Sequence, residues 1–572
     1  MRLSVSKSKN SMSLYVKDDV TIDGKRTSKI VEKLGTVDEL REKLGGRDPI
    51  EWAKEYIAEL NRLEKEGREP VVIAKYSPSK LIKKDERRSF NGGYLFLEKI
   101  YYGLGLNKIC SEISEKYKFE YNLDSIFSRL LYGRIIFPSS KLSTYELSWE
   151  LIEPPDFKLH QIYRALEVIA RETDFIQASL YQNSLKLSKR NTGILYYDCT
   201  NYFFEIEEED GLKQYGYAKD HKPNPIVQMG LFMDGDGVPL AFSITEGNKN
   251  EQLTLKPLEN KILSDFKLSR FIVCTDAGLA STCNRKFNDK KDRAFITTQS
   301  IKKLKGYLKE WALDPKGWHL DDDSKTYDIL ELDDIKDRDR IFYKERWIKE
   351  DGLEQKLIVT YSIKYRDYHS KIRNSQIGRA LKVIDTNPTK IKKHNQNDYK
   401  RFIKRISCTS EGELAEKESY TLDDDLIKSE AVYDGFYAVC TNLDEDATKI
   451  ARINRQRWEI EECFRILKSE FKARPVHLRR DDRITAHFTT CFISLLMYRL
   501  LEKKLESKFT CDTIIRHLRN MNFQELKGSG YIPTYTRDDF TDAIHEAFGF
   551  RTDYEIVSLK QMKKILKETK SR

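Results

Sequence analysis

Cysteine pairs are missing from this chain of 572 residues. Its nine cysteines are scattered, odd in number and never spaced as Cys-x-x-Cys. The sequence therefore gives no sign of a disulfide framework or of a structural zinc site. Scattered free cysteines fit a reducing compartment, so we expect a cytoplasmic protein.

Long apolar runs are also missing. Residues 1–4 do not open a signal peptide. The most apolar helix-like segment, residues 488–500, follows His487, includes Arg499 and is shorter than the roughly 20 apolar residues of a membrane span. We therefore expect a buried helix and no membrane partner. His487 receives no chemical role, because a core or capping histidine is the commoner case.

The chain also lacks a large net charge of either sign. The formal net charge is +10, with 34% charged and 39% hydrophobic residues. This modest excess leans toward a polyanionic partner without naming nucleic acid. The length exceeds one ordinary core and predicts two to four domains.

The N-terminal third divides into a short β segment and a helical block. Residues 1–45 alternate polar and apolar in places, and Asp23-Gly24 predicts a hairpin turn. A helix and a polar connector at 65–88 follow. Residues 93–190 show helical periodicity, interrupted at Pro138 and at Pro154-Pro155.

From residue 194 the pattern changes to short β runs. The order predicts three strands, a helix, a strand, a helix and a strand, and a mixed α/β fold. The runs are Ile194–Tyr197 before Asp198, residues 226–233 and 238–245 on either side of Asp234-Gly235-Asp236-Gly237, Phe271–Cys274 before Asp276, and Ala294–Thr297.

Residues 301–435 are charged and have no single period, so they look inserted rather than continuous with the sheet. Short strand candidates stand at 341–343 and 357–359. Residues 436–440 resume β character, and a long amphipathic helix is predicted from about 446 to 471.

Two aspartates each follow an apolar strand, Asp198 and Asp276. Either one alone is more often a turn former or a helix cap, and a turn fully explains Asp234 and Asp236. Carboxylates at the ends of strands can also hold two Mg²⁺ ions about 4 Å apart, an arrangement that cleaves phosphodiesters.

The predicted helix carries two stripes. One is apolar and buried, and a second, charged stripe lies about 100° around the axis. Ion pairing on a solvated face and a carboxylate flanked by cations at the edge of the core explain the charged stripe equally well. The apolar stripe is Ile460, Phe464, Leu467 and Phe471, and the charged stripe is Arg457, Glu461, Arg465 and Lys468.

Arg457, Glu461 and Lys468, spaced by three and six residues, resemble the Y-R-E-K motif of the bacterial insertion-sequence DDE transposases. The group it resembles is the IS-four-like superfamily, which cuts and pastes through hairpin intermediates. Tyr-Tyr-Asp-Cys-Thr at Asp198 and Thr-Asp-Ala-Gly-Leu at Asp276 resemble the first two carboxylates of its triad. The resemblance covers roughly residues 90–505.

The resemblance implies a role for each matching residue. Asp198, Asp276 and Glu461 would be catalytic and would bind Mg²⁺, with Mn²⁺ able to substitute. The DNA-binding residues would be Asn454, Arg457, Arg465 and Lys468. Asn454 stands where the motif has Tyr, which puts that contact in doubt, although Asn can still hydrogen-bond a phosphate.

An RNase H-like catalytic domain with a β-rich insertion and an N-terminal helical region is the fold that the resemblance implies. Relatives use such an insertion for a flipped base, so the tryptophans of this segment are candidates to stack on one, although core packing is the commoner fate of each. Those tryptophans are Trp311, Trp318 and Trp347. The domains we expect are a hairpin and helix region at 1–88, a helical DNA-binding region at 89–190, the RNase H-like core at 191–300 and 441–505, an insertion at 301–440, and a helical tail at 506–572.

The function expected is transposition of an insertion sequence by cleavage at the element ends and strand transfer. The partners would be the terminal inverted repeats, target DNA and a second copy of the chain, in the nucleoid-associated part of a bacterial cytoplasm. Two alternatives stay open: an RNase H-like nuclease without strand transfer, and a transposase-derived DNA-binding regulator. The presence of all three carboxylates argues against the regulator.

Overall fold

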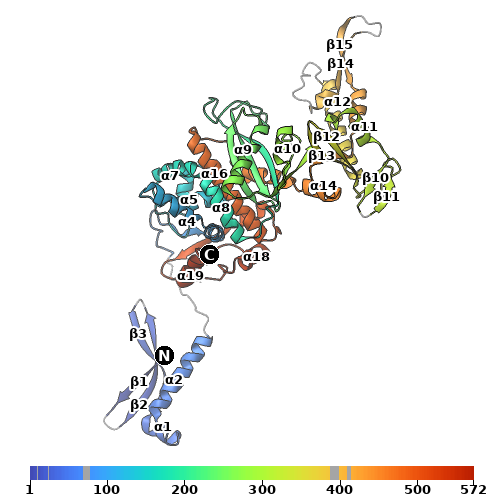
Figure 1. Cartoon of the computed structure of the whole chain (residues 1–572). Helices are drawn as coiled ribbons and strands as arrows, with labels where there is room; N and C mark the ends of the chain where they lie inside the picture. Colours follow the sequence, from blue (N-terminus) through green and yellow to red (C-terminus); the bar gives the residue numbers. More distant parts are fainter. Residues whose placement is uncertain are drawn as a thin grey trace. The chain divides into compact units, whose positions relative to one another are not determined.

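The computed structural model describes residues 1–8, 11–22, 25–67, 78–321, 323–386, 398–408 and 414–571. The chain forms two compact units, Met1–Lys84 and Asp85–Arg572 (Figure 1).

The first unit is a three-stranded antiparallel sheet with two helices. Strands β1 (Arg2–Lys7), β2 (Met12–Ile22) and β3 (Lys25–Thr36) lie in sequence order. Helices α1 (Val37–Lys43) and α2 (Pro49–Gly67) follow. The predicted pairing of β2 with β3 is confirmed, with Ile22 opposite Lys25. The predicted turn itself, Asp23-Gly24, lies outside the described residues.

The second unit begins with a short strand and a block of helices. The last of these helices leads directly into the central sheet. In chain order they are β4 (Ser89–Asn91), α3 (Tyr94–Gly103), α4 (Leu106–Tyr117), α5 (Leu123–Ile136), α6 (Lys141–Ser148), α7 (Leu159–Arg171) and α8 (Thr173–Leu187).

A ten-stranded mixed sheet organises this unit, which confirms the predicted α/β class. Its order is β11-β10-β12-β13-β16-β9-β8-β5-β6-β7. β5, β8 and β9 are parallel, as the crossovers through α9 (Leu255–Asp265) and α10 (Thr282–Asn288) require. The strands are β5 (Ile194–Phe203), β6 (Ile226–Asp234), β7 (Pro239–Glu246), β8 (Phe271–Thr275), β9 (Arg293–Gln299), β10 (Trp318–Leu320), β11 (Asp323–Tyr327), β12 (Phe342–Glu350), β13 (Leu353–Tyr361) and β16 (Phe436–Thr441).

The segment 301–435 extends this sheet, so the expectation that it would not be continuous with the sheet is wrong. β13 pairs with β16, and β16 pairs with β9. The continuity was hidden because β12 has Lys, Glu and Arg on its exposed positions, which masks the alternation of a half-buried strand. The segment also contains α11 (Gly306–Leu313), α12 (Ile363–Thr386), α13 (Asp424–Ala431) and the separate ribbon of β14 (Ile403–Cys408) and β15 (Leu414–Leu422).

The predicted helix at 446–471 is interrupted. It consists of α14 (Ala447–Arg455), α15 (Trp458–Arg465) and a π-helical turn, Ile466–Glu470. The apolar stripe from Ile460 to Phe471 is buried as predicted. The break at residues 456–457 was not visible in the apolar periodicity, because both helices bury their apolar sides in the same core.

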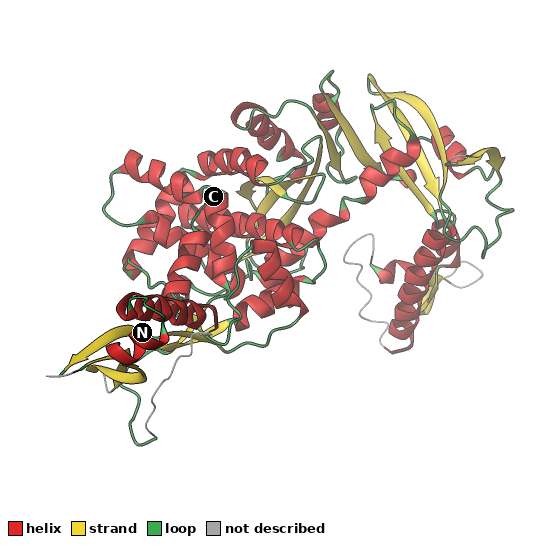
Figure 2. Cartoon of the chain, turned by 90° about the horizontal axis from the view of Figure 1, so that it is seen from below, coloured by secondary structure: helices red, strands yellow, loops and turns green. Residues whose placement is uncertain are grey.

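Helix α16 (Asp481–Lys504) is long and apolar enough to cross a membrane, but 89% of its most apolar window is buried inside the protein. This agrees with the buried helix predicted at 488–500. Helices α3, α5, α7 and α8 pack against α16, whereas other helices, red in Figure 2, lie with the outer strands of the sheet. The predicted helical tail also contains strands, because β17–β19 form a small sheet with β4. The final elements are α17 (Cys511–Asn520), β17 (Asn522–Leu526), β18 (Gly530–Pro533), α18 (Asp539–Phe548), β19 (Val557–Ser558) and α19 (Leu559–Thr569).

Candidate active site

Asp198 and Asp276 lie side by side on neighbouring parallel strands. The last paired residues of β5 and β8 are Tyr196 and Cys274. Two residues further along each strand, the same register places Asp198 beside Asp276. Adjacent strands are about 4.8 Å apart, so the two carboxylates share one edge of the sheet.

Asp198 does not end its strand, as the sequence suggested, because β5 continues to Phe203. It lies instead just beyond the point where the parallel pairing with β8 stops. β6 still pairs with β5 there, with Leu231 opposite Asp198. On the other side of β5 the Val476 amide donates to the Phe203 carbonyl at 3.0 Å, so the gap in backbone pairing lies between Tyr196 and Phe203, at the two acids.

Burial and the neighbouring carboxylate disfavour the charged form of Asp198. Burial and the nearby Asp276 carboxylate raise the pKa of Asp198 to about 6. Each acid accepts one short-range backbone hydrogen bond: Asp198 Oδ1 from the Cys199 amide at 2.7 Å and Asp276 Oδ1 from the Leu279 amide at 3.0 Å. Two adjacent acids with so few donors form a site that favours a bound cation.

Glu461 lies apart from this pair. Its side chain is 63% exposed, and its Oε1 is 3.8 Å from Arg457 Nη1. Among the described residues, no group of three His, Cys, Asp or Glu side chains is arranged to hold a metal ion. The structure thus brings Asp198 and Asp276 together and leaves the Glu461 carboxylate outside.

The two cations that flank Glu461 in the sequence do interact with the acid pair. Arg457, four residues before it, lowers the pKa of Asp198, against the larger effects of burial and of Asp276. Lys468, seven residues after it, donates from Nζ to Thr200 Oγ1 of β5 at 2.6 Å. Burial lowers the pKa of Lys468 to about 8, and Asp198 is among the acids that oppose this shift. Arg457 and Lys468 therefore lie near Asp198, whereas the Glu461 carboxylate points to solvent.

Arg465 does not join the site. Its guanidinium pairs with Glu462 at 2.7 Å and with Glu470 at 3.1 Å. Arg465 ends α15, whereas Lys468 lies in the π-helical turn Ile466–Glu470 and reaches Thr200 of β5. The charged stripe predicted from the sequence therefore splits.

Asn454 is buried, with 3% of its surface exposed. Its Nδ2 donates to the Tyr437 hydroxyl at 2.8 Å, and its Oδ1 accepts from Cys274 Sγ at 3.4 Å. A side chain with both amide atoms engaged in the core is poorly placed to contact a phosphate. The structure therefore gives Asn454 a positioning role between β8, β16 and α14. Asn454 also lines the cavity that contains Arg457 and Glu461, and its contact with DNA stays a prediction.

Lys219 is a site residue that the sequence analysis missed. Its Nζ donates to the Cys199 carbonyl at 2.6 Å and pairs with Glu251 at 3.1 Å. Although burial opposes it, the pKa of Lys219 is raised, because Asp198 and Glu251 lie close. The signal was the charged run Lys219-Asp220-His221-Lys222 in the connection between β5 and β6, a position facing the same sheet edge.

A cavity of about 850 Å³ opens beside Glu461. Its lining includes Arg457 and Glu461 together with five aromatic side chains: Tyr361, Tyr365, Tyr368, Tyr437 and Trp458. Trp458 is 59% exposed and Tyr368 57% exposed.

The tryptophans that the sequence offered for base stacking lie elsewhere. Trp318 is fully buried. Trp311 and Trp347 are each covered by a cation, Arg346 and Lys356 respectively. None of the three lines the cavity at Glu461, so the exposed aromatics there are different residues from those predicted.

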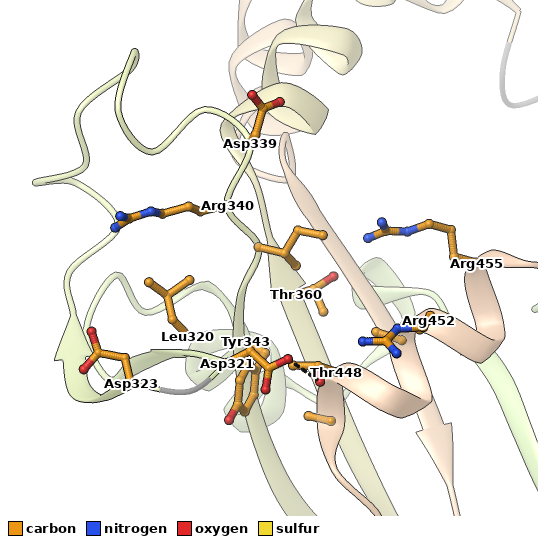
Figure 3. A pocket seen from close by; sticks show the side chains of 13 residues that line it. Leu320, Asp321, Asp323, Asp339, Arg340, Tyr343, Thr360, Thr448, Arg452 and Arg455 are labelled. Atoms are coloured by element: carbon orange, nitrogen blue, oxygen red, sulfur yellow. Dashed lines mark hydrogen bonds between the residues drawn. The ribbon is translucent and has the colours of Figure 1, made fainter.

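A second cavity of about 530 Å³ adjoins the first, and the two share Thr360 and Arg455 among their lining residues. Figure 3 shows Arg452 and Arg455 projecting from α14 toward Arg340 across it. Asp321, Asp323 and Asp339 line the same cavity, so its charged lining contains as many acids as arginines.

His487 is a core residue. It is buried, with Nε2 3.2 Å from the Ala473 carbonyl oxygen, and burial lowers its pKa well below the usual range. This agrees with leaving it without a chemical role.

Comparison with known proteins identifies a family. Residues 202–497, more than half of the chain, match the transposase DDE domain. The match includes Asp276 and Glu461 and begins four residues after Asp198. No curated protein matches this chain.

Among solved structures, a piggyBac transposase synaptic complex with hairpin DNA is 9% identical, with a TM-score of 0.36 over 75% of this chain and 78% of that chain. This likeness is too distant to indicate function. The family match alone makes DNA the substrate, and DDE transposases generally use divalent metal ions. The chain belongs to the transposase DDE domain family and is an enzyme of DNA transposition.

Proposed function

We propose that this protein is an RNase H-like transposase that cleaves DNA at the ends of a bacterial insertion sequence and transfers the freed 3′ ends into target DNA. The observation that carries the proposal is the in-register pair Asp198 and Asp276, with Arg457 and Lys468, the cations that flank Glu461 in the sequence, beside Asp198. The strand order β7-β6-β5-β8-β9, with β5, β8 and β9 parallel, supports the RNase H-like assignment.

The residues fit a pair of Mg²⁺ ions, for which Mn²⁺ would substitute. Asp198 and Asp276 are oxygen donors on one sheet edge, and each has one backbone donor, so the oxygen ligands that Mg²⁺ prefers are available. Glu461 would complete the set. Its present partner is an ion pair at 3.8 Å on an exposed side chain, and such pairs stabilise a fold by only about 0–1 kcal/mol, so turning toward the acids costs little.

The chain's own groups would position the DNA. Metal ions bound by the acids would activate the attacking water or 3′ hydroxyl and stabilise the leaving oxygen. Arg457 would hold a phosphate by a bidentate fork and Lys468 would hold one as a point charge. Arg455 lines the same cavity as Arg457 and would be available to a further phosphate.

The cavity beside Glu461 suits an unpaired base. Tyr368 and Trp458 supply exposed rings and Tyr365 a half-buried one, in the cavity that Arg457 also lines. A base stacked on an aromatic ring gains about 1–3 kcal/mol. This supports a hairpin route with a flipped base, held by these residues rather than by Trp311, Trp318 or Trp347. Two copies of the chain would pair the two element ends, in a bacterial cytoplasm.

The test uses pre-cut duplex ends, a target plasmid and Mg²⁺. We expect integrated product from the wild type, loss of product with Glu461→Gln, and near-normal product with the matched control Glu462→Gln, whose acid pairs with Arg465 instead. Cleavage without any integrated product would favour a simple nuclease. Equal activity of the Glu461→Gln and wild-type proteins would contradict the assignment.

A further inference from the structure

The N-terminal unit has one face covered by helices and one face open. Leu14 and Val16 of β2 are fully buried, and Leu14 forms a core with Leu40 of α1 and Ala53 of α2. Successive residues of a strand point to opposite faces. Tyr15 and Lys17 therefore lie on the other face, which α1 and α2 do not cover.

Strand register defines the open face. Tyr15 pairs with Ser4 of β1 and Lys33 of β3, and Lys17 pairs with Arg2 of β1. Paired residues on adjacent strands share a face. Cations and hydroxyl groups thus lie together on it, with Ser6, Ser13 and Ser28 at neighbouring positions. The same face carries Asp19, opposite Ser28 and paired with Arg2, and the exposed Ile30, opposite Lys17.

Charge is segregated between the two layers of this unit. Residues 1–36, which form the strands, contain eight Lys and Arg against four Asp and Glu, a net charge of +4. Residues 37–67, which form the helices, contain six against nine, a net charge of −3. Within the described part of the chain, neither Lys17 nor Lys33 forms an ion pair, and Arg2 pairs with Asp19 at 3.3 Å.

We propose that the open face of β1–β3 is a second DNA-binding surface, which docks duplex DNA independently of the catalytic unit. The inference rests on the proposed function only for the identity of the partner. Lys and Arg with Ser and Tyr hydroxyls are the side chains that contact phosphates, and a β-ribbon or sheet fits the major groove. The acidic helices behind the sheet exclude the opposite orientation on a polyanion.

The first test measures binding of the full-length protein to duplexes from each flank of its gene, in EDTA so that cleavage does not interfere. We expect Lys17→Ala combined with Lys33→Ala to weaken binding about tenfold and to lower the salt dependence by about two contacts. The matched control is Arg41→Ala with Lys54→Ala on α1 and α2, which should bind as the wild type does. Unchanged affinity and salt dependence in the Lys17/Lys33 variant would overturn the proposal.

A second measurement tests the same surface without the Lys17/Lys33 variant, in case that variant folds poorly. An iron–EDTA cleavage reagent attached to Ser28→Cys should cut flank DNA at discrete positions, whereas the same reagent on Lys54→Cys should not. The unsubstituted chain, treated alike, gives the background from exposed Cys283. Equal cutting from both positions, or a change in dimerisation rather than in DNA binding, would sink the proposal. Because Asp198→Asn should bind DNA normally, failure of catalysis and failure of this surface are distinguishable.

Discussion

Two acidic sites on the central sheet differ in how their charges are satisfied. Asp234, at the end of β6, is fully buried and accepts from Arg190 Nε at 2.6 Å and from the amides of Asp236 and Val238, both at 3.0 Å. Asp198 instead lies beside another acid, and its pKa is raised. The protein itself supplies the donors and the counter-charge of Asp234, as the turn motif predicted. Asp198 lacks them and would need a bound cation to balance its charge.

This difference separates a structural acid from a functional one better than sequence position does. Both residues lie on apolar strands, and both precede short polar residues. Only the count of donors and the sign of the neighbouring charge distinguish them. A buried acid with a full set of donors stabilises the fold, whereas a pair of acids with few donors makes the empty site unfavourable and prepares it for a cation.

The largest expected difference between the two kinds of acid is in the rate of DNA cleavage. Asp276→Asn removes one metal ligand and should lower the rate of end cleavage by about a thousandfold or more, since metal ions supply several kcal/mol of charge stabilisation. Cleavage of labelled flank duplexes in Mg²⁺ measures this effect. Asp236→Asn, a turn acid paired with Lys503 at 2.6 Å, is the control and should cleave normally. Near-normal cleavage by Asp276→Asn would remove it from the site.

The free energy of unfolding should depend on the ion pair of the buried acid Asp234. Arg190→Ala leaves the buried Asp234 carboxylate without its counter-charge and should lower the free energy of unfolding by about 3–5 kcal/mol. Denaturant unfolding followed by circular dichroism checks this value. Asp276→Asn, which relieves repulsion, should not destabilise the metal-free protein. The comparison fails if both variants lose stability equally.

The pH dependence of stability sharpens the contrast. Because the pKa of Asp198 in the folded protein is about 6, its stabilising contribution is complete below about pH 4 and is lost as the pH rises through 6. In EDTA, Asp198→Asn should match the wild type near pH 4 and exceed it by on the order of 2 kcal/mol above pH 7. Thermal unfolding across this range measures the difference, and a gap that does not vary with pH would contradict the raised pKa.

The smallest effect concerns one phosphate contact. Lys468→Ala should weaken end binding at all sequences and reduce its salt dependence by about one contact. Lys449→Ala, on α14 and paired with Glu445, serves as the control. Fluorescence anisotropy at several salt concentrations gives both slopes. An unchanged slope for Lys468→Ala would place that side chain away from DNA.

Much of the central sheet followed from local patterns. The apolar runs before Asp198 and Asp276 and the Asp-Gly turn between β6 and β7 predicted the right strands, because buried strands and tight turns have strong local signatures. The ends were less accurate, since β5 continues beyond Asp198 through polar residues that pair only with β6.

Contacts between distant segments escaped prediction. The burial of Asn454 depends on Tyr437 and Cys274, and the nearness of Lys219 to Asp198 depends on how a polar connection folds back on the sheet. Neither arrangement has a local pattern. The separation of Arg465 from Lys468 involves the π-helical turn Ile466–Glu470, which the apolar periodicity does not reveal.

The central claim is that Glu461 joins Asp198 and Asp276 in holding metal ions, and a change of metal specificity tests it most directly. Thiolate is a soft ligand that Mn²⁺ accepts more readily than Mg²⁺. Glu461→Cys should lose end cleavage in Mg²⁺ and regain part of it in Mn²⁺, while Glu462→Cys should cleave normally in both. Full activity of Glu461→Cys in Mg²⁺ would show that Glu461 binds no metal and would contradict the account.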